Sequence, residues 1–297
     1  MKVNIYCMTI KHYHLIDKLP KNIIPFGLGK NNFPQNWLNE KQGDSIIDLN
    51  KFFGEATGIY WIWKNLMNNY DKNSLIGFCQ YRRLWLNGLF DKKQKNNISS
   101  LYSNLLRNNN ELLNSSESIL LQPTIFKNIN LTQDFDNLYG KNILEDCTNL
   151  INEKDRYDFK EFLKGNKLSI CNMFITKPEI FNQYCHEMFD WINKCFVYCK
   201  NKNLLSNKNM RLPIFMVERF TAFWFQKYSN CNYLSFARLG NVILSNSLNK
   251  LSLRNNPLSA PFERASLTTC IAESCPRVHT TTSAPRASFI RRASSRA

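Results

Sequence analysis

The sequence predicts an α/β fold, in which short buried strands alternate with longer amphipathic helices. Strand-like apolar runs occupy residues 3–9, 76–80 and 118–122. Residues 178–201 have helical spacing, and Pro178 stands at the helix start, where proline is favoured. The chain has 297 residues, of which 43% are hydrophobic, so it can bury a full core. We therefore expect a sheet flanked by helices.

The run 76–80 is the strand around which we expect the fold to be organised. It continues into Gln80-Tyr81-Arg82-Arg83, and open α/β sheets bind ligands just outside the carboxyl ends of their strands. Guanidinium groups can hold a phosphate through two parallel hydrogen bonds. The pattern therefore indicates a phosphate site. The alternative is that the arginines bond a neighbouring carboxylate and exposed carbonyl groups.

Two histidines, His12 and His14, follow the first predicted strand. In nucleotide-binding α/β domains the loop after the first strand commonly meets the base or the ribose. These side chains could therefore contact a nucleotide. Because the sequence identifies no partners for them, the pattern favours ordinary surface histidines.

The region between the first strand and residue 76 is expected to hold a long loop and one helix. Residues 20–50 are rich in proline and glycine, which predicts loop structure with at most one short helix. Asp44 in this loop either faces a ligand or caps a turn. Residues 53–69 have helical spacing. Their aromatic cluster is either a sugar-stacking platform or core, and it comprises Tyr60, Trp61 and Trp63.

The second half of the chain has the same alternation of elements. The apolar spacing predicts a strand at 168–176 and helices at 98–113, 134–151, 155–163 and 214–228. Glu218 and Arg219 lie among aromatic and aliphatic residues of the last helix. Burying such charges is costly unless each finds a partner. This pair is therefore either an internal ion-pair device or part of a site.

The charge of the chain points to an anionic partner. The formal net charge is +16, which suits nucleic acid, a membrane surface or a phosphorylated small molecule. The lysines are interspersed with asparagine and form no dense basic helix, and no nucleic-acid-binding motif is present. We therefore expect no nucleic-acid partner.

Cysteine usage and hydropathy favour a cytoplasmic protein. The ten cysteines are scattered without the paired spacing of a zinc ribbon. Cys195 and Cys199 lie one helical turn apart, where buried thiols are common core residues. No apolar run is long enough for a transmembrane helix, and the N-terminus leads directly into a strand-like pattern.

The composition changes after about residue 255. Asparagine, lysine and isoleucine give way to alanine, serine, threonine, arginine and proline over 256–297. This segment lacks the apolar periodicity needed to pack, so we expect a catalytic domain over 1–255 and a disordered tail foreign to it. The alternative is a basic tail that touches anionic lipid or RNA.

Four sequence blocks together resemble a known bacterial family. They are residues 54–65, 76–83, 172–175 and 217–220. In order and spacing they resemble the glycosyltransferase-like family catalogued as domain of unknown function 4422, found among capsule and lipopolysaccharide biosynthesis proteins. The resemblance covers about residues 3–245. One position departs from it, because the family usually has histidine where this chain has Gln80. If that histidine serves as an acid or base, this member would be impaired; if it only donates a hydrogen bond to substrate, glutamine could replace it.

The resemblance implies a fold like that of the nucleotide-sugar transferases (GT-A-like), with a single mixed sheet flanked by helices. It also implies transfer of a sugar from a nucleotide diphosphate sugar to a glycan or lipid-linked acceptor. Such an enzyme would be cytoplasmic or peripheral at the inner face of the membrane. The alternative is a non-catalytic carbohydrate- or nucleotide-binding member of the family.

Glycosyl transfer assigns hypothetical roles to the polar residues. Charge neutralisation at the diphosphate is expected from Arg82 and Arg83, with Gln80 and Tyr81 beside them. The expected base is Glu218, with Glu55 as second choice. The sugar or acceptor pocket is expected to contain Asn172, Tyr60, Lys64, Arg219 and Asp44.

The sequence alone does not determine whether such an enzyme needs a divalent metal ion. Many transferases of this shape hold Mn or Mg with an Asp-any-Asp pair at the end of the central strand. Here that strand end carries glutamine, tyrosine and arginine. Asp134 and Asp136 have the spacing, but they stand at a predicted helix start, where acidic residues favour the helix dipole. We therefore assign no metal ligands.

Overall fold

The computed structural model describes residues 2–88, 98–206 and 209–238. The tail predicted for residues 256–297 lies outside these described residues. Within the first part of the chain the elements are β1 (Val3–Thr9), η1 (Ile16–Lys18), β2 (Ile23–Gly27), β3 (Leu38–Asn39), η2 (Ile47–Leu49), α1 (Asn50–Phe53), α2 (Ala56–Leu66), η3 (Met67–Asn69), β4 (Leu75–Gln80) and β5 (Arg83–Trp85).

The remaining described elements alternate helices and strands in the same way. They are α3 (Ile98–Ser103), α4 (Leu112–Ser115), β6 (Ser118–Leu121), β7 (Thr124–Ile125), α5 (Leu131–Tyr139), α6 (Ile143–Thr148), α7 (Glu153–Leu163), β8 (Lys167–Leu168), β9 (Phe174–Thr176), α8 (Pro178–Asn201), α9 (Leu212–Tyr228), β10 (Cys231–Leu234) and β11 (Phe236–Arg238).

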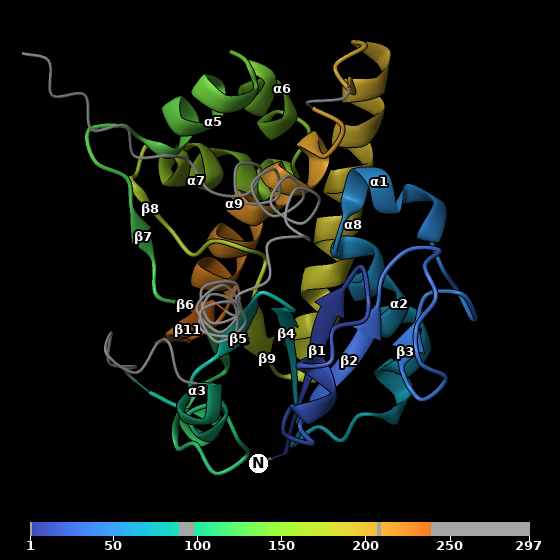
Figure 1. Ribbon diagram of the computed structural model, residues 1–297. Helices are drawn as coiled ribbons and strands as arrows, with labels where there is room; N and C mark the ends of the chain where they lie inside the picture. Colours follow the sequence, from blue (N-terminus) through green and yellow to red (C-terminus); the bar gives the residue numbers. More distant parts are fainter. Residues whose placement is uncertain (1, 89–97, 207–208, 239–297) are drawn as a thin grey trace, which may run out of the picture. The chain divides into compact units, whose positions relative to one another are not determined.

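A mixed sheet forms the centre of the described fold. Its strand order is β10-β6-β9-β4-β1-β2-β3, and β5 pairs with β4 and β11 (Figure 1). Strands β3, β2, β1 and β4 run parallel, whereas β9 is antiparallel to both of its neighbours. A small separate sheet pairs β7 with β8. The predicted α/β fold with a mixed sheet is therefore confirmed.

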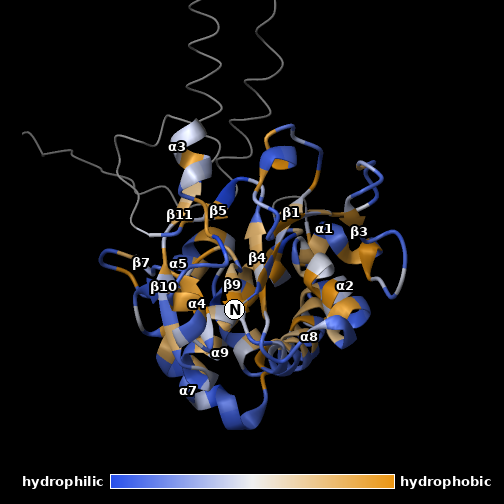
Figure 2. Cartoon of the chain, turned by 90° about the horizontal axis from the view of Figure 1, so that it is seen from below, coloured by the Kyte–Doolittle hydropathy of each residue, from blue (hydrophilic) through white to orange (hydrophobic). Residues whose placement is uncertain are grey.

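The sheet is buried on both faces, which explains why its strands appear in the sequence as nearly continuous apolar runs. Along β1, Val3, Ile5 and Cys7 join one core cluster with α3 and α4, whereas Tyr6 and Met8 join another with α2, α8 and α9. Figure 2 shows β4 as a largely hydrophobic strand between these helices. Burial on both sides fixes the register of each strand.

The two long C-terminal helices pack against each other under one face of the sheet. Helix α8 is 24 residues long and begins at Pro178, as the sequence predicts. Its buried stripe includes Phe181, Tyr184 and Trp191, and the last two meet the aromatic residues of α9. Within the described residues, no helix combines the length and hydrophobicity needed to cross a lipid bilayer.

Strand β2 lies within the segment that the sequence predicts as loop, so that expectation is wrong for 23–27. Pro25 has no backbone N–H for a ladder and normally stays at an open edge. In the structure β2 pairs along its length with β1, but β3 reaches only Phe26 and Gly27. Pro25 therefore lies where the outer edge of β2 lacks a partner strand, which makes the proline tolerable.

Two predicted helices are each interrupted by a glycine. The helix predicted at 53–69 starts only at Ala56, because α1 ends at Phe53 and Gly54 follows with a φ of 51°. The pattern at 134–151 divides into α5 and α6 at Gly140, whose φ is 117°. Side-chain periodicity continues across these breaks, which is why it does not reveal them. The break at Gly54 places Glu55 at the amino end of α2.

Candidate functional site

The parallel strands β1 and β4 lie side by side at a reversal in the strand order. From β1 the chain proceeds to β2 and β3 on one side, and β4 then lies on the other side of β1. In open α/β sheets a crevice forms at such a reversal, outside the carboxyl ends of the two strands. Those ends are Thr9 and Gln80. The residues that follow them are therefore the first candidates for a ligand site.

The stretch after Gln80 folds back as a tight hairpin. Gln80 pairs with Arg83 in an antiparallel ladder, so Tyr81 and Arg82 form the link between β4 and β5. The N–H of Tyr81 donates to the carbonyl of Met8 at 3.0 Å, which ties the hairpin to the end of β1. The Tyr81 ring stacks on Tyr13 from the loop after β1, with 4.7 Å between centroids.

The two arginines that the sequence places together have different environments. Arg82 is half-buried on the turn, and its guanidinium lies 5.2 Å from the centre of the Tyr81 ring. Arg83 begins the return strand, is 7% exposed, and donates to Gln80 Oε1 at 2.6 Å. The structure thus brings the arginines to the expected strand end but does not present them as an equivalent pair.

Glu55 joins the end of β4 to two other segments. Its Oε1 accepts hydrogen bonds from Gln80 Nε2 at 3.2 Å and from Asn172 Nδ2 at 3.0 Å. Its Oε2 forms an ion pair with Arg211 at 3.3 Å, and the side chain is 15% exposed. Glu55 therefore occupies the centre of a polar cluster on β4, α2, α9 and the segment before β9.

The segment before β9 contributes through an unusual turn. Cys171 and Asn172 have φ angles of 79° and 48°, a left-handed conformation that is uncommon outside glycine. This turn divides the strand predicted at 168–176 into β8 and β9. It directs the Cys171 carbonyl to Gln80 Nε2 at 3.0 Å and buries Asn172. Strained backbone of this kind is concentrated at functional sites.

The second carboxylate of the cluster is Glu218 on α9. It is half-buried, and its Oε1 accepts a hydrogen bond from the Cys171 N–H. Burial raises the pKa of Glu218, whereas Arg219 and the Cys171 N–H act in the opposite direction. Glu55 raises this pKa further and Arg83 lowers it. Glu218 is therefore electrostatically coupled to both sides of the cluster and holds a proton more readily than an exposed glutamate.

A family model described as Domain of unknown function (DUF4422) matches residues 4–230. The chain belongs to the DUF4422 family. The cluster of Glu55, Gln80, Asn172 and Glu218 lies entirely within the matched residues. No curated protein sequence matches this DUF4422 chain.

Among solved structures, the DUF4422 chain is similar to one titled "WbbM bifunctional glycosytransferase apo structure". The TM-score is 0.57 at 17% sequence identity, and the match covers 80% of this chain. It covers 45% of that protein, so the DUF4422 chain corresponds to less than half of its length. At this identity the likeness establishes a shared fold, which confirms the glycosyltransferase-like architecture.

Arg219 of the DUF4422 chain lies in the core beside the cluster. Its guanidinium pairs with Asp134 of α5, lies 4.9 Å from the centre of the Phe135 ring, and donates to the Phe215 carbonyl at 3.1 Å. Both charged side chains are 4% exposed. The sequence left open whether Arg219 belongs to an internal ion pair or to a site. These contacts favour an internal ion pair, formed with Asp134. This pair ties α5 to α9.

Three of the expected pocket residues gather farther along α2 and in the loop beside it, namely Tyr60 and Lys64 of α2 and Asp44 of the loop before η2. The hydroxyl of Tyr60 donates to Asp44 at 3.1 Å, and Lys64 lies 3.6 Å from the centre of the Trp63 ring. Asn65 closes the Asp44 turn, donating to its carbonyl and accepting from its N–H, both at 2.9 Å. This group begins about one helical turn beyond Glu55, so the structure places it apart from the Glu55 cluster.

The Asp-any-Asp spacing at 134 and 136 does not suit a metal ion. Asp134 is buried against Arg219, and residues two apart on a helix do not face each other. The helix start is capped instead by Asn130, whose side chain accepts from the Gln133 N–H at 2.7 Å. The residues present at this position thus do not fit the divalent cation that many transferases of this shape carry.

Sequence reasoning missed Arg211 and the backbone of Cys171. Arg211 precedes α9 and reaches Glu55 across Gly54, where an added Cβ would clash with the Arg211 guanidinium. The sequence signals were a glycine just before α2 and an arginine at a helix start, where acidic residues are more usual. The role of Cys171 comes from its backbone conformation, which its side-chain type does not reveal.

Proposed function

We propose that this chain is a glycosyltransferase that moves a sugar from a nucleotide diphosphate sugar to a growing bacterial surface polysaccharide, of the capsule or lipopolysaccharide type. The family, the glycosyltransferase-like fold and the polar cluster at the carboxyl ends of the strands support this proposal. The acceptor in this proposal is a glycan or a lipid-linked glycan.

The observation that best supports the proposal is the pair of carboxylates, Glu218 and Glu55, at this edge of the sheet. Glu218 is half-buried, has a raised pKa and is oriented by the Cys171 N–H. A carboxylate of this kind is suited to take the proton of an acceptor hydroxyl, because a general base works best with a pKa near the working pH. Glu55 is already engaged with Arg211, Gln80 and Asn172, so we assign it the task of positioning them.

The hairpin after β4 supplies the proposed donor contacts. Arg82 lies on the turn, where its guanidinium can meet the diphosphate and offset its developing negative charge. Arg83 acts through Gln80, to which it is hydrogen-bonded, and Tyr81 fixes the hairpin against the loop after β1. Asn172 completes the sugar pocket in this scheme.

The proposed acceptor surface consists of Tyr60, Lys64 and Asp44. Tyr60 and Lys64 present an aromatic face and a cation beside Asp44, a combination that suits sugar hydroxyl groups and ring faces. We assign Arg219 to support of α9 against α5. The net charge of +16 is compatible with peripheral contact at an anionic inner-membrane surface.

A panel of nucleotide sugars tests this function. We expect one donor to raise the thermal unfolding midpoint, because a ligand that binds only the folded state stabilises it. The panel is run with and without Mn²⁺ or Mg²⁺, which also determines metal dependence. The selected donor should then be hydrolysed slowly without acceptor, with release of free nucleotide.

Variants separate catalysis from binding in this assay. Glu218→Gln should reduce turnover by about 100-fold or more while donor binding persists. Glu179→Gln, at an exposed position on α8, is the matched control and should retain turnover. Full turnover in Glu218→Gln would exclude Glu218 as the base. Donor binding without any turnover in the unmodified protein would instead favour the non-catalytic binding function.

A further inference from the structure

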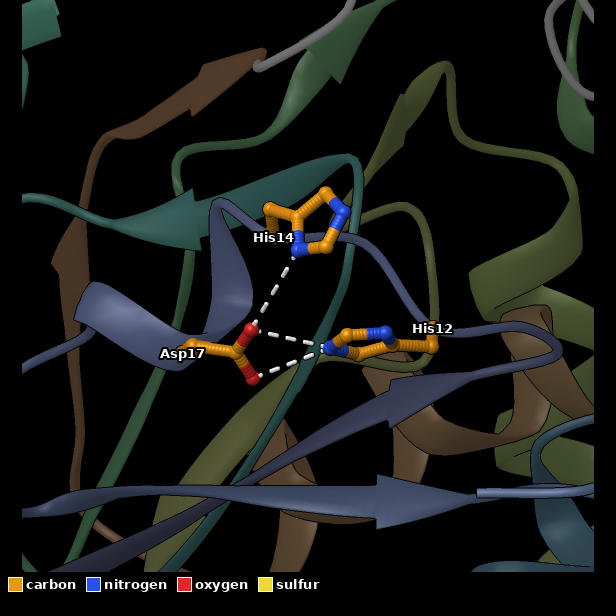
Figure 3. Close-up of side chains that lie close together, drawn as sticks. All are labelled: His12, His14 and Asp17. Carbon is orange, nitrogen blue, oxygen red and sulfur yellow. Dashed lines mark hydrogen bonds and ion pairs between the residues drawn. The ribbon is translucent and has the colours of Figure 1, made fainter. Parts of the chain in front are cut away.

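Three potential metal ligands converge beside the reversal point of the sheet, and the Glu55 cluster does not include them. They are His12 and His14, from the loop after β1, and Asp17, from η1. One ligand atom from each residue lies within 4.8 Å of the other two (Figure 3). All three side chains belong to one short segment, so the fold of that segment alone brings them together.

We propose that His12, His14 and Asp17 form a binding site for a divalent transition-metal ion of the zinc type. The site is independent of the proposed glycosyl transfer, because it uses none of the residues assigned to that reaction. Two imidazoles and one carboxylate are a donor set that zinc accepts with a fourth position left open. Imidazole donors also select against magnesium, which prefers oxygen ligands.

The interatomic distances suit an ion of this size. His12 Nε2 lies 2.9 and 3.1 Å from the two oxygens of Asp17, and His14 Nδ1 lies 3.9 Å from one of them. Ligand atoms around a tetrahedral ion with bonds of about 2.0–2.1 Å lie roughly 3.3 Å apart. The measured distances fall on both sides of this value. Small side-chain rotations would therefore bring all three donors into coordination.

The surroundings favour His12 as the anchor of the site. Its ring packs edge to face against Trp37, with 5.1 Å between centroids, and Trp37 is buried. The His14 side chain is 95% exposed and can rotate freely to complete coordination. Asp17 and Trp37 also line a shallow depression of about 420 Å³ beside the cluster. One ligand is thus held in place, and a hollow lies beside the Asp17 carboxylate.

An ordinary surface ion pair would explain less of this arrangement. An exposed ion pair contributes only about 0–1 kcal/mol to stability, and it consists of one cationic group beside one carboxylate. Here two imidazole nitrogens face the same carboxylate, and the rings lie 5.1 Å apart. A shared cation would offset the charge of Asp17 and let both imidazoles bind as neutral donors.

Metal binding would also anchor the loop that carries Tyr13. This residue lies between the two histidines in sequence and stacks on Tyr81 of the hairpin. An ion held by His12, His14 and Asp17 would join the ends of this loop and restrict the motion of Tyr13. The expected consequence is a metal-dependent stabilisation that can be measured without any substrate.

Cobalt(II) absorption of the full chain, after chelator treatment, is the direct test. We expect saturable binding of one Co²⁺, displaced by Zn²⁺, with the visible bands of nitrogen and oxygen ligation. His12→Ala and Asp17→Asn should each weaken binding at least roughly 10-fold, because even the loss of an outer-shell partner has effects of this size. His186→Ala removes an exposed histidine on α8 and should leave binding unchanged.

Several outcomes would overturn the proposal. One is the absence of saturable Co²⁺ binding by the unmodified protein. Another is unchanged binding in the His12→Ala/His14→Ala double variant. Intense thiolate-to-cobalt charge-transfer bands would assign the ion to the cysteines instead. In support, Zn²⁺ should raise the thermal midpoint of the unmodified chain and of His186→Ala, but not that of the double variant.

Discussion

The side-chain amide of Gln80 donates a hydrogen bond to the carboxylate of Glu55 at 3.2 Å. The same amide nitrogen donates to the Cys171 carbonyl, and the amide oxygen accepts from Arg83. Gln80 thus serves as both donor and acceptor at the centre of the cluster. A neutral imidazole can also donate through one ring nitrogen and accept through the other. The glutamine can therefore act as a bridging residue where the family resemblance leads us to expect a histidine.

Gln80 variants should distinguish bridging from proton transfer. Gln80→Ala removes the three hydrogen bonds that this side chain makes to Glu55, Cys171 and Arg83, and should lower the free energy of unfolding by about 1–3 kcal/mol. Gln80→His should lower it less, because a neutral imidazole can restore one donated and one accepted hydrogen bond of the bridge. Urea denaturation with a constant m-value measures both. A large rise in donor turnover for Gln80→His, without a change in donor affinity, would show that this position needs a titrating side chain.

Arg82 is expected to control donor affinity without controlling the fold. Removing a hydrogen bond to a charged group costs about 1.5–3 kcal/mol, so Arg82→Ala should weaken donor binding roughly 10- to 100-fold. Arg107 is exposed and serves as the control site for loss of one positive charge. Isothermal titration with the donor selected from the panel measures the change. Unchanged affinity in Arg82→Ala would remove Arg82 from the proposed site.

The buried pair of Asp134 and Arg219 is expected to be strongly non-additive. Removing one partner leaves an uncompensated charge in the core, so Asp134→Leu or Arg219→Met should each cost about 3–5 kcal/mol of stability. The double variant should recover most of this loss. A double-mutant cycle by chemical denaturation gives the coupling free energy. Additive losses would mean that the two charges contribute independently.

Glu40 should make the stability of the protein depend on pH. The residue is 1% exposed, and burial raises its pKa from 4.5 to about 7. Its Oε1 accepts from Thr57 at 2.8 Å, but its Oε2 has no hydrogen-bond partner among the described residues. The carboxyl group therefore stays protonated in the folded protein at pH values where the unfolded chain has already lost the proton.

The sign of this effect follows from linkage. Below pH 4.5 both states are protonated, and the stabilisation associated with the raised pKa is fully present. It is lost as the pH rises through about 7, with a total change of about 3 kcal/mol. Glu40→Gln should flatten this part of the pH profile, measured by denaturation at pH 5 and pH 8. An identical slope in the variant would contradict the assignment.

Much of the fold could be predicted from the sequence because its strands are buried on both faces. Residues 3–9 and the helix at 178–201 have the predicted bounds, since continuous apolar runs and a proline at a helix start are local signals. The left-handed turn at Cys171 and Asn172 was not predicted, because neither residue is glycine. Likewise, Pro25 and Gly27 concealed β2, which depends on pairing with β1.

The members of the candidate site could be predicted more easily than the connections between them. Glu55, Gln80, Asn172 and Glu218 were all named from the sequence, because each lies in one of the four blocks that resemble the family. Their hydrogen bonds join positions 25 to 117 residues apart, and such contacts leave no local pattern. Arg219 could not be assigned to a partner because Asp134 is distant in sequence. Arg211 was missed for the same reason.

The position of β9 also has a consequence for the order in which the protein folds during synthesis. Strand β9 lies between β4 and β6, although both of those strands are made before it. Until residues 174–176 leave the ribosome, β4 and β6 each keep an open edge that can pair with another chain. The nascent protein is therefore exposed to aggregation through β4 and β6 until β9 has been synthesised and pairs with both.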